Sequence, residues 1–148
     1  MGGGSHEDAW RQRAQEERVV ILVDTSIWIQ LFRARRPLDL DALIDFDDIV
    51  TCLPIVQEVL QGFREEAAYR PARESMLSLP IIESPLGSDV FLDAVALYRT
   101  ARRSGKTVRS SVDCLIAACA IRHDLEVLHR DRDFAVISQI SALRERTS

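Results

Sequence analysis

Several features that mark other classes of protein are missing from this chain of 148 residues. It has no apolar run approaching the roughly eighteen residues that a membrane-spanning helix needs. Its start has no basic segment followed by an apolar core, which argues against a secretory signal. The 3 cysteines form no CxxC pair, so we expect buried thiols rather than a disulfide framework or a zinc site. Together these absences favour a cytoplasmic protein.

The short motifs of several enzyme classes are absent as well. The sequence contains no GxSxG, no P-loop, no GxGxxG and no HExxH. Its histidines, His6, His123 and His129, do not have the spacing of metal ligands. We expect His129, at the end of a predicted strand, to be a structural or tuning residue rather than a base. The acidic residues are therefore the remaining candidates for catalysis.

The formal net charge of −4 argues against a protein that coats nucleic acid without specificity. Residues 37–48 contain several aspartates and no basic residue, whereas residues 99–109 contain basic residues and no acidic one. A local basic face can hold a phosphate backbone in a protein that is acidic overall. A solvated helix face and loop explains the same charges equally well. The basic residues of this segment are Arg99, Arg102, Arg103, Lys106 and Arg109.

Short apolar runs alternate with helical patterns, which indicates an α/β fold with a mostly parallel sheet. Residues 19–23 are continuously apolar, as in a strand buried on both faces. The polar turn at 24–26 follows, and then Ile27, Leu31 and Phe32 recur at helical spacing. Nothing in the polar residues from 139 to 148 assigns them to an element. Further strands are expected at 49–52, 80–83 and 126–129, and helices at 38–45, from Pro54 onward, and at 67–79, 88–104, 110–123 and 132–138.

The length fits a single domain with a sizeable core, and the hydrophobic content of 47% and charged content of 28% are typical of globular proteins. Residues 1–18 are expected to be a leader or a segment left by cloning, helical from about residue 7. Residues 19–148 then form one domain, since no internal repeat or interdomain linker is visible.

Asp113 is the most unusual acidic residue in the chain. In residues 112–121 every other side chain is apolar or small. An ionised aspartate is costly to bury unless it is paired, hydrogen-bonded or bound to a cation. Asp113 is therefore expected to have a specific role.

The elements after Asp113 predict that Asp131 lies beside it. A helix of about ten residues runs roughly 15 Å away, and the strand that follows returns about 13–17 Å. Asp24 stands at the carboxyl end of the first strand, and Glu58 just over one turn into the helix after the second strand. The carboxyl edge of a parallel sheet is where α/β proteins bind ligands. We therefore expect these four carboxylates to share one site.

Four carboxylates at one edge would repel one another unless a cation lay between them, and a hard ion such as Mg²⁺ or Mn²⁺ is the expected solution. Each acid also has a simpler explanation. Asp24 could cap a helix, and Glu58 could be a solvated surface residue. The two aspartates at 131 and 133 could form a turn or pair with neighbouring arginines. Taken jointly, the four acids favour a metal site.

Four segments occur in an order that resembles the PIN-domain ribonucleases, specifically the VapC-type toxins of bacterial toxin–antitoxin pairs. The segments are VDTSIW at 23–28, QEVLQG at 57–62, RSSVDCLIA at 109–117 and HRDRDF at 129–134. The resemblance implies a three-layer α/β/α sandwich with a mostly parallel central sheet. It also implies an endoribonuclease, dependent on Mg²⁺ or Mn²⁺, that acts on RNA and often on tRNA.

Carried over by position, the resemblance makes Asp24, Glu58, Asp113 and Asp131 the catalytic and metal-binding quartet. Asp133 is an alternative fourth acid, although the geometric argument prefers Asp131. The expected partners are an RNA substrate, an antitoxin with an arginine-bearing tail and a second copy of the chain. Candidate RNA contacts are Ser26, Arg102, Arg103 and Arg109.

Two other functions remain open from the sequence. A catalytically silent PIN fold could serve as an RNA-binding or protein-interaction module. A receiver-like phospho-acceptor domain also needs acids at strand ends, but it requires a lysine at the sheet edge. The single lysine, Lys106, is expected in a loop, so this reading ranks last.

Overall fold

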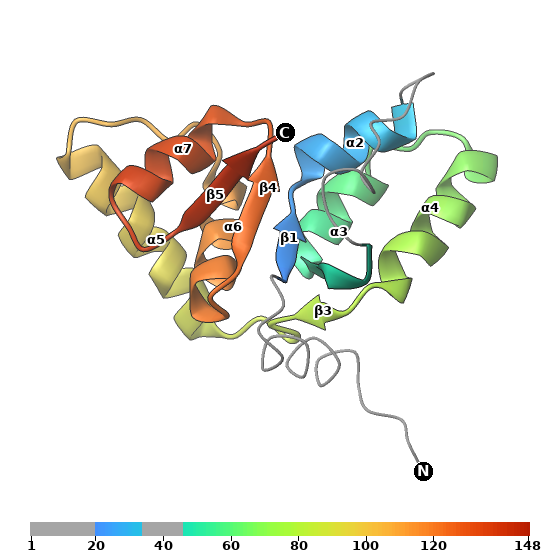
Figure 1. The fold of residues 1–148 in the computed structure, drawn as a ribbon, viewed down its shortest axis with the longest axis horizontal. Coiled ribbons are helices and arrows are strands. Elements are labelled where there is room, and N and C mark those ends of the chain that lie inside the picture. Colours follow the sequence, from blue (N-terminus) through green and yellow to red (C-terminus); the bar gives the residue numbers. More distant parts are fainter. Residues whose placement is uncertain (1–19, 34–45) are drawn as a thin grey trace, which may run out of the picture.

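The protein is described by a computed structural model over residues 20–33 and 46–148. The leader expected at 1–18 and the helix expected at 38–45 lie outside these residues. Five strands form an all-parallel sheet in the order β3-β2-β1-β4-β5 (Figure 1). The strands are β1 (Ile21–Val23), β2 (Ile49–Cys52), β3 (Ile81–Ile82), β4 (Glu126–His129) and β5 (Arg144–Thr147).

Helices connect the strands and flank the sheet. Figure 1 shows α2, α3 and α4 beside the half that contains β1, β2 and β3, and α5, α6 and α7 beside the half that contains β4 and β5. None of the helices in the described part of the chain has the length and hydropathy to cross a membrane. The helices are α2 (Thr25–Arg33), α3 (Leu53–Leu60), α4 (Glu66–Ser78), α5 (Ser88–Arg103), α6 (Ser111–Arg122) and α7 (Arg132–Gln139), with a 3₁₀ turn, η2 (Phe46–Asp48).

Strand β1 is the centre of the sheet, as its unbroken apolar sequence predicts. It pairs with β2 on one side and β4 on the other. Leu22 lies opposite Val50 in one neighbour and Val127 in the other. All three residues of β1 are buried, because helices cover the sheet around it. The predicted α/β fold with a parallel sheet is confirmed.

Helix α6 is almost entirely buried except at its ends, and its small side chains explain how closely it packs. Residues 116–120 are all buried, and the run contains Ala117, Ala118 and Ala120. Small side chains let α6 contact both the sheet and helix α5. The helix therefore carries Asp113, in its first turn, into the interior of the protein.

Strand β5 was not predicted from the sequence. Its residues are Arg144, Glu145, Arg146 and Thr147, and none of them is buried. An edge strand is held mainly by backbone hydrogen bonds to one neighbour, so it needs no alternation of apolar side chains. The polar residues near the end of the chain form this strand, parallel to β4.

Candidate active site

Asp24 lies immediately after β1 and is only 2% exposed. Its Oδ2 accepts hydrogen bonds from the Ser26 backbone N–H (3.1 Å) and the Ser26 hydroxyl (2.6 Å). Its other oxygen, Oδ1, is buried and has no hydrogen-bond partner. Burial raises the pKa of Asp24, and the nearby charge of Asp131 adds to the increase, whereas the hydrogen bonds from Ser26 oppose it. One carboxylate oxygen is thus fixed and the other is available.

Asp113 is buried in the first turn of α6 and is 4% exposed. Its Oδ2 has no hydrogen-bond partner. Burial raises the pKa of this carboxyl from 3.8 to about 9, and the charges of Asp131 and Asp24 add to the increase. Without a cation the Asp113 carboxyl is therefore protonated at neutral pH.

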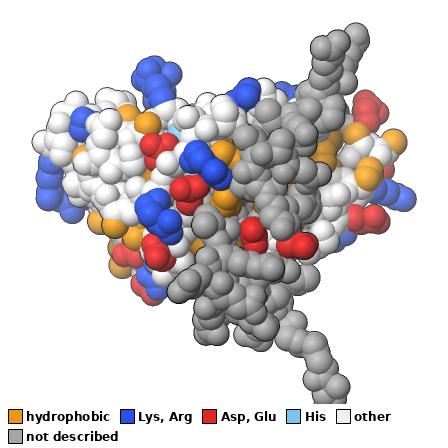
Figure 2. All heavy atoms as spheres, in the orientation of Figure 1, with side chains coloured by type: hydrophobic (Ala, Val, Ile, Leu, Met, Phe, Trp, Pro, Cys, Tyr) orange, Lys and Arg blue, Asp and Glu red, His pale blue; other side chains and the backbone are white. Residues whose placement is uncertain are grey.

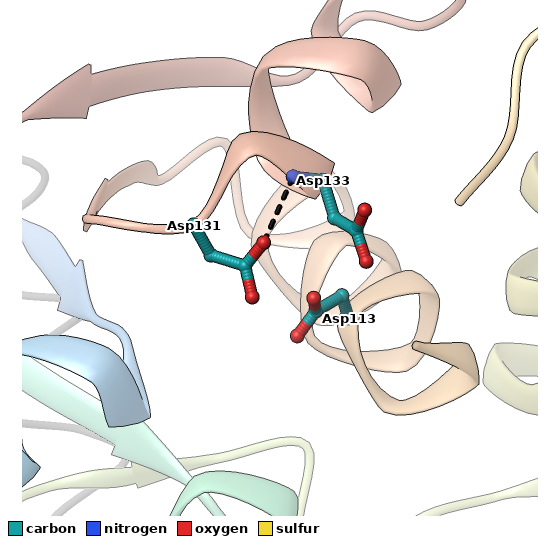
Figure 3. Close-up of side chains that lie close together, drawn as sticks. All are labelled: Asp113, Asp131 and Asp133. Atoms are coloured by element: carbon teal, nitrogen blue, oxygen red, sulfur yellow. Dashed lines mark hydrogen bonds between the residues drawn. The ribbon is translucent and has the colours of Figure 1, made fainter. Parts of the chain in front are cut away.

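Asp131 and Asp133 face Asp113 from the start of α7 (Figure 3). One carboxylate oxygen from each of the three residues lies within 4.8 Å of the others. Asp131 precedes α7 and caps it, since its Oδ1 accepts the Asp133 backbone N–H over 2.9 Å. Figure 3 shows the side chains of Asp131 and Asp133 close to that of Asp113. This is an arrangement that can hold a cation.

Asp133 also has a structural role. Its Oδ2 accepts the backbone N–H groups of Arg109 (3.0 Å) and Ser110 (2.9 Å), which ties the segment before α6 to the start of α7. Its Oδ1 is buried and has no hydrogen-bond partner. The structure therefore places both Asp131 and Asp133 against Asp113. The preference for Asp131 as the fourth acid stays a prediction.

Glu58 lies on α3, across the carboxyl edge of the sheet from α6. Its Oε1 accepts the hydroxyl of Thr25 over 2.9 Å. Partial burial raises the pKa of Glu58; the hydrogen bond from Thr25 opposes the increase, and the charges of Asp24 and Asp131 contribute to it. The charges of Asp24 and Asp131 therefore raise the pKa of both Glu58 and Asp113. Asp24 and Glu58 flank the three-aspartate cluster rather than belonging to it.

Two hydrogen-bonded side chains hold the loops that carry these acids. The Ser26 hydroxyl accepts the Arg130 backbone N–H over 3.0 Å, which joins the loop after β1 to the loop after β4. His129 is fully buried, and its Nδ1 accepts the Asp131 backbone N–H over 3.1 Å. Because Nδ1 is an acceptor, Nε2 carries the proton and donates to Glu145 Oε2 over 2.6 Å. The structure thus assigns His129 the structural role that its position suggested.

Sequence reasoning missed Glu145. It lies on β5, where the polar sequence gave no sign of a strand, and 16 residues separate it from its partner His129. Only the parallel pairing of β5 with β4 brings the two residues together. Glu145 alternates with arginines on an edge strand, and this local sequence does not indicate its role.

The predicted RNA contacts lie at the surface. Arg102 and Arg103 are exposed in the last turn of α5, and Arg109 is exposed just before α6. Figure 2 shows basic and acidic side chains side by side over the part of the surface in view that is not grey. Among the predicted contacts, Arg109 is joined to the acidic cluster, since its backbone N–H donates to Asp133 Oδ2.

Comparison with known proteins agrees with this geometry. The family model described as PIN domain matches residues 21–140. Ribonuclease VapC11 of Mycobacterium tuberculosis (strain H37Rv) is 40% identical over 134 residues, which cover 84% of this chain and 96% of the relative. The VapC ribonuclease Mb1587 of Mycobacterium bovis has the same identity and coverage.

Solved structures have the same fold. VapBC-5 of Mycobacterium tuberculosis, a toxin–antitoxin system, matches with a TM-score of 0.66 at 24% identity, over 88% of this chain and 100% of that chain. A toxin–antitoxin complex from Klebsiella pneumoniae matches with a TM-score of 0.62 at 28% identity, over 78% of this chain and 90% of that chain. On the family model, the relatives and the fold together, this chain belongs to the PIN domain family, and the resemblance to VapC ribonucleases is confirmed.

Proposed function

We propose that this chain is a Mg²⁺- or Mn²⁺-dependent endoribonuclease and the toxin of a toxin–antitoxin pair. The observation that carries the proposal is a set of buried carboxylate oxygens with no hydrogen-bond partner at one edge of the sheet. They are Asp24 Oδ1, Asp113 Oδ2 and Asp133 Oδ1. Relatives at 40% identity that are named ribonucleases support the same conclusion.

The donor set fits a hard divalent cation. Mg²⁺ and Mn²⁺ prefer oxygen ligands, and carboxylates are the protein groups they favour. Buried polar atoms without partners are rare in folded proteins, so three such oxygens at one edge of the sheet call for a ligand. The residues that would hold the ion are Asp24, Asp113 and Asp131, with Glu58 close by and Asp133 as the alternative to Asp131.

A cation held at this site lowers the pKa of a bound water and offsets negative charge on the phosphate during hydrolysis of the RNA backbone. The side chains around it prepare the site. Ser26 holds one oxygen of Asp24, and Thr25 holds one oxygen of Glu58, so that each carboxylate keeps a fixed orientation. Asp113 has to release its proton before it can act as a charged ligand. Loading of the site is therefore expected to strengthen as the pH rises.

RNA is the substrate that the family and the charge distribution support, and tRNA is a reasonable target. A phosphate backbone approaching an acidic cluster needs basic groups beside it. Arg102, Arg103 and Arg109 supply such groups on one flank and are exposed. Ser26 is the candidate contact nearest to Asp24. These contacts would position the RNA rather than read its sequence.

An antitoxin is the expected protein partner. Several solved relatives with this fold are toxin–antitoxin complexes. The buried acidic cluster would attract an arginine-bearing segment, since guanidinium groups form bidentate hydrogen bonds with carboxylates. Such a segment would block the site by occupying the place of the cation.

A second copy of the chain is the expected partner for the outer face of α5. This face carries a stripe of exposed apolar side chains: Phe91 (48% exposed), Leu92 (66%), Val95 (52%) and Tyr98 (40%). Three of these side chains, Phe91, Val95 and Tyr98, line an apolar hollow of 430 Å³ together with residues of α6. Homodimer interfaces are rich in such groups. Val95→Glu should convert a dimer to a monomer in analytical ultracentrifugation, and a dimer that persists in this variant would contradict the assignment.

Cleavage of RNA by the purified chain tests the proposed activity. We expect cleavage with Mg²⁺ or Mn²⁺ that stops with EDTA and falls below detection in Asp24→Asn and Asp113→Asn. Glu74→Gln is the matched control, because it removes an exposed carboxylate from α4 and should leave activity unchanged. Circular dichroism checks that each variant is folded. Cleavage that survives both EDTA and the two aspartate substitutions would overturn the proposal, and a wild-type chain that binds RNA without cutting it would favour a silent PIN fold.

A further inference from the structure

Beside the acidic site lies a hollow of 430 Å³ with the opposite charge. It is lined by one face of α2 and by the loop after β4. The helix residues are spaced at i, i+3, i+4 and i+7, so they form a single stripe that leads away from the site. The lining residues are Ser26, Ile29, Gln30, Arg33 and Arg130.

The hollow is continuous with the candidate active site through Ser26. The Ser26 hydroxyl donates to Asp24 Oδ2 (2.6 Å) and accepts the Arg130 backbone N–H (3.0 Å), so both walls of the hollow are tied to Asp24. Arg33 lies seven residues further along α2, roughly 10 Å from Ser26 along the helix axis. A polymer bound in the hollow would therefore extend into the acidic site.

The lining has the chemistry of a nucleotide site. None of the described residues that line it is acidic, and the two arginines are exposed. The Arg130 Nε donates to the Ser148 hydroxyl over 2.6 Å, which orients this guanidinium while leaving its other N–H groups available. Arginine forks match phosphate oxygens. Half-buried Ile29 adds an apolar surface between the charged groups.

Gln30 supplies the second polar element. Its Oε1 is buried and has no hydrogen-bond partner. An amide oxygen can only accept, so it needs a donor from a ligand. In a nucleotide that donor is a ribose 2′-hydroxyl or an exocyclic amino group of a base.

From this arrangement we infer that the hollow binds the nucleotide next to the scissile phosphate, with Arg33 and Arg130 on phosphate and Gln30 on the ribose or base. The inference rests on the proposed ribonuclease activity and extends it to a defined subsite. An RNA strand is repelled by the acidic cluster alone, so a basic subsite directly beside that cluster holds the strand in place. The same charge disfavours an arginine-bearing protein segment at this position.

Binding measured without cleavage tests the subsite separately from the activity. The probe is a short, fluorescein-labelled, single-stranded RNA of randomised sequence, bound to the full chain in EDTA and followed by fluorescence anisotropy. Arg33→Gln and Arg130→Gln should each weaken binding several-fold. Each should also reduce the slope of log affinity against log salt by about 0.7, the value for one lost phosphate contact on a single strand. Arg73→Gln, an exposed arginine on α4, is the matched control and should change neither quantity.

Gln30→Ala distinguishes the two possible donors. If the ribose donates, the substitution should weaken binding of oligoadenosine RNA and spare the DNA of the same sequence. If a base amino group donates, it should weaken binding of the RNA and of that DNA alike. The inference is overturned if Arg33→Gln and Arg130→Gln bind the RNA probe as tightly as the wild type does. It is also overturned if these variants keep their affinity for RNA and lose affinity for an acidic peptide. Absence of cleavage by the wild type with Mn²⁺ would count against the proposed function and leave this binding result to stand by itself.

Discussion

Replacing Asp113 by asparagine should stabilise the metal-free protein at neutral pH. The Asp113 carboxyl is buried, its pKa is raised to about 9, and its protonated form can donate to Asp131 and Asp133. An asparagine amide has the same shape and donates in the same way, but it never ionises. The variant therefore keeps the protonated arrangement permanently.

The size of the effect follows from the two pKa values. The unfolded chain ionises this group above 3.8, whereas the folded chain does so only above about 9. Between these values the folded state binds more protons, so the free energy of unfolding of the wild type falls as the pH rises. The loss from pH 5 to pH 7 is about 3 kcal/mol, since one pKa unit corresponds to about 1.4 kcal/mol. The variant lacks this contribution, so its advantage over the wild type should grow by that amount.

Urea unfolding of both proteins in EDTA, followed by circular dichroism from pH 5 to pH 8, measures the difference. Acids distant from Asp113 titrate equally in the two proteins, so their contributions cancel when the free energies are subtracted. A difference that stays constant with pH, or that favours the wild type at pH 7, would refute the assignment of a protonated, buried Asp113.

Adding Mn²⁺ should narrow the difference in stability between the two proteins. A ligand present at a hundred times its dissociation constant stabilises the folded state by about 2.7 kcal/mol. The wild type should gain this amount, and Asp113→Asn should gain much less, because a neutral amide replaces the carboxylate. Equal gains for the two proteins would place the cation elsewhere.

Three further predictions concern the groups around the site. His129→Phe should weaken Mn²⁺ binding about tenfold or more in calorimetric titration, because the Asp131 backbone N–H loses its acceptor. His129→Asn retains an acceptor and should recover most of the affinity. Equal affinities in the two variants would contradict this prediction. Asp133→Ala should lower the unfolding free energy by about 1–3 kcal/mol, since two backbone N–H groups lose their acceptor, and an unchanged melting temperature would refute it. Arg122→Met should lower the urea midpoint of unfolding more than Arg70→Met does, because Arg122 pairs with three carboxylates and Arg70 with one. Equal shifts would show that the additional ion pairs of Arg122 do not contribute to stability.

The positions of Asp24 and Asp113 could be anticipated from local sequence. Asp24 follows a run of apolar residues of strand length, and Asp113 interrupts an apolar helix. Both signals depend on residues close in the chain, where hydrophobic periodicity is informative. The parallel sheet could be anticipated for the same reason, whereas the fold family was inferred from the resemblance of four segments to the PIN-domain ribonucleases.

Other features depend on contacts between distant segments. Strand β5 is polar and lies at the edge, so its only determinant is pairing with β4. The Glu145–His129 hydrogen bond exists only because of that pairing. Likewise, Arg130 reaches the hollow on α2 across a separation of 104 residues from Ser26.

By itself, the sequence determined which segments are buried and which carboxylates interrupt or follow them, because burial is encoded by patterns of neighbouring residues. Only the tertiary structure decided how the acids share the site. It placed Asp133 as well as Asp131 against Asp113, gave Asp133 the N–H groups before α6, and set a basic hollow beside the acidic cluster. Hydrogen-bond partners are fixed by the relative placement of elements in space, and two acids two residues apart cannot be distinguished until that placement is known.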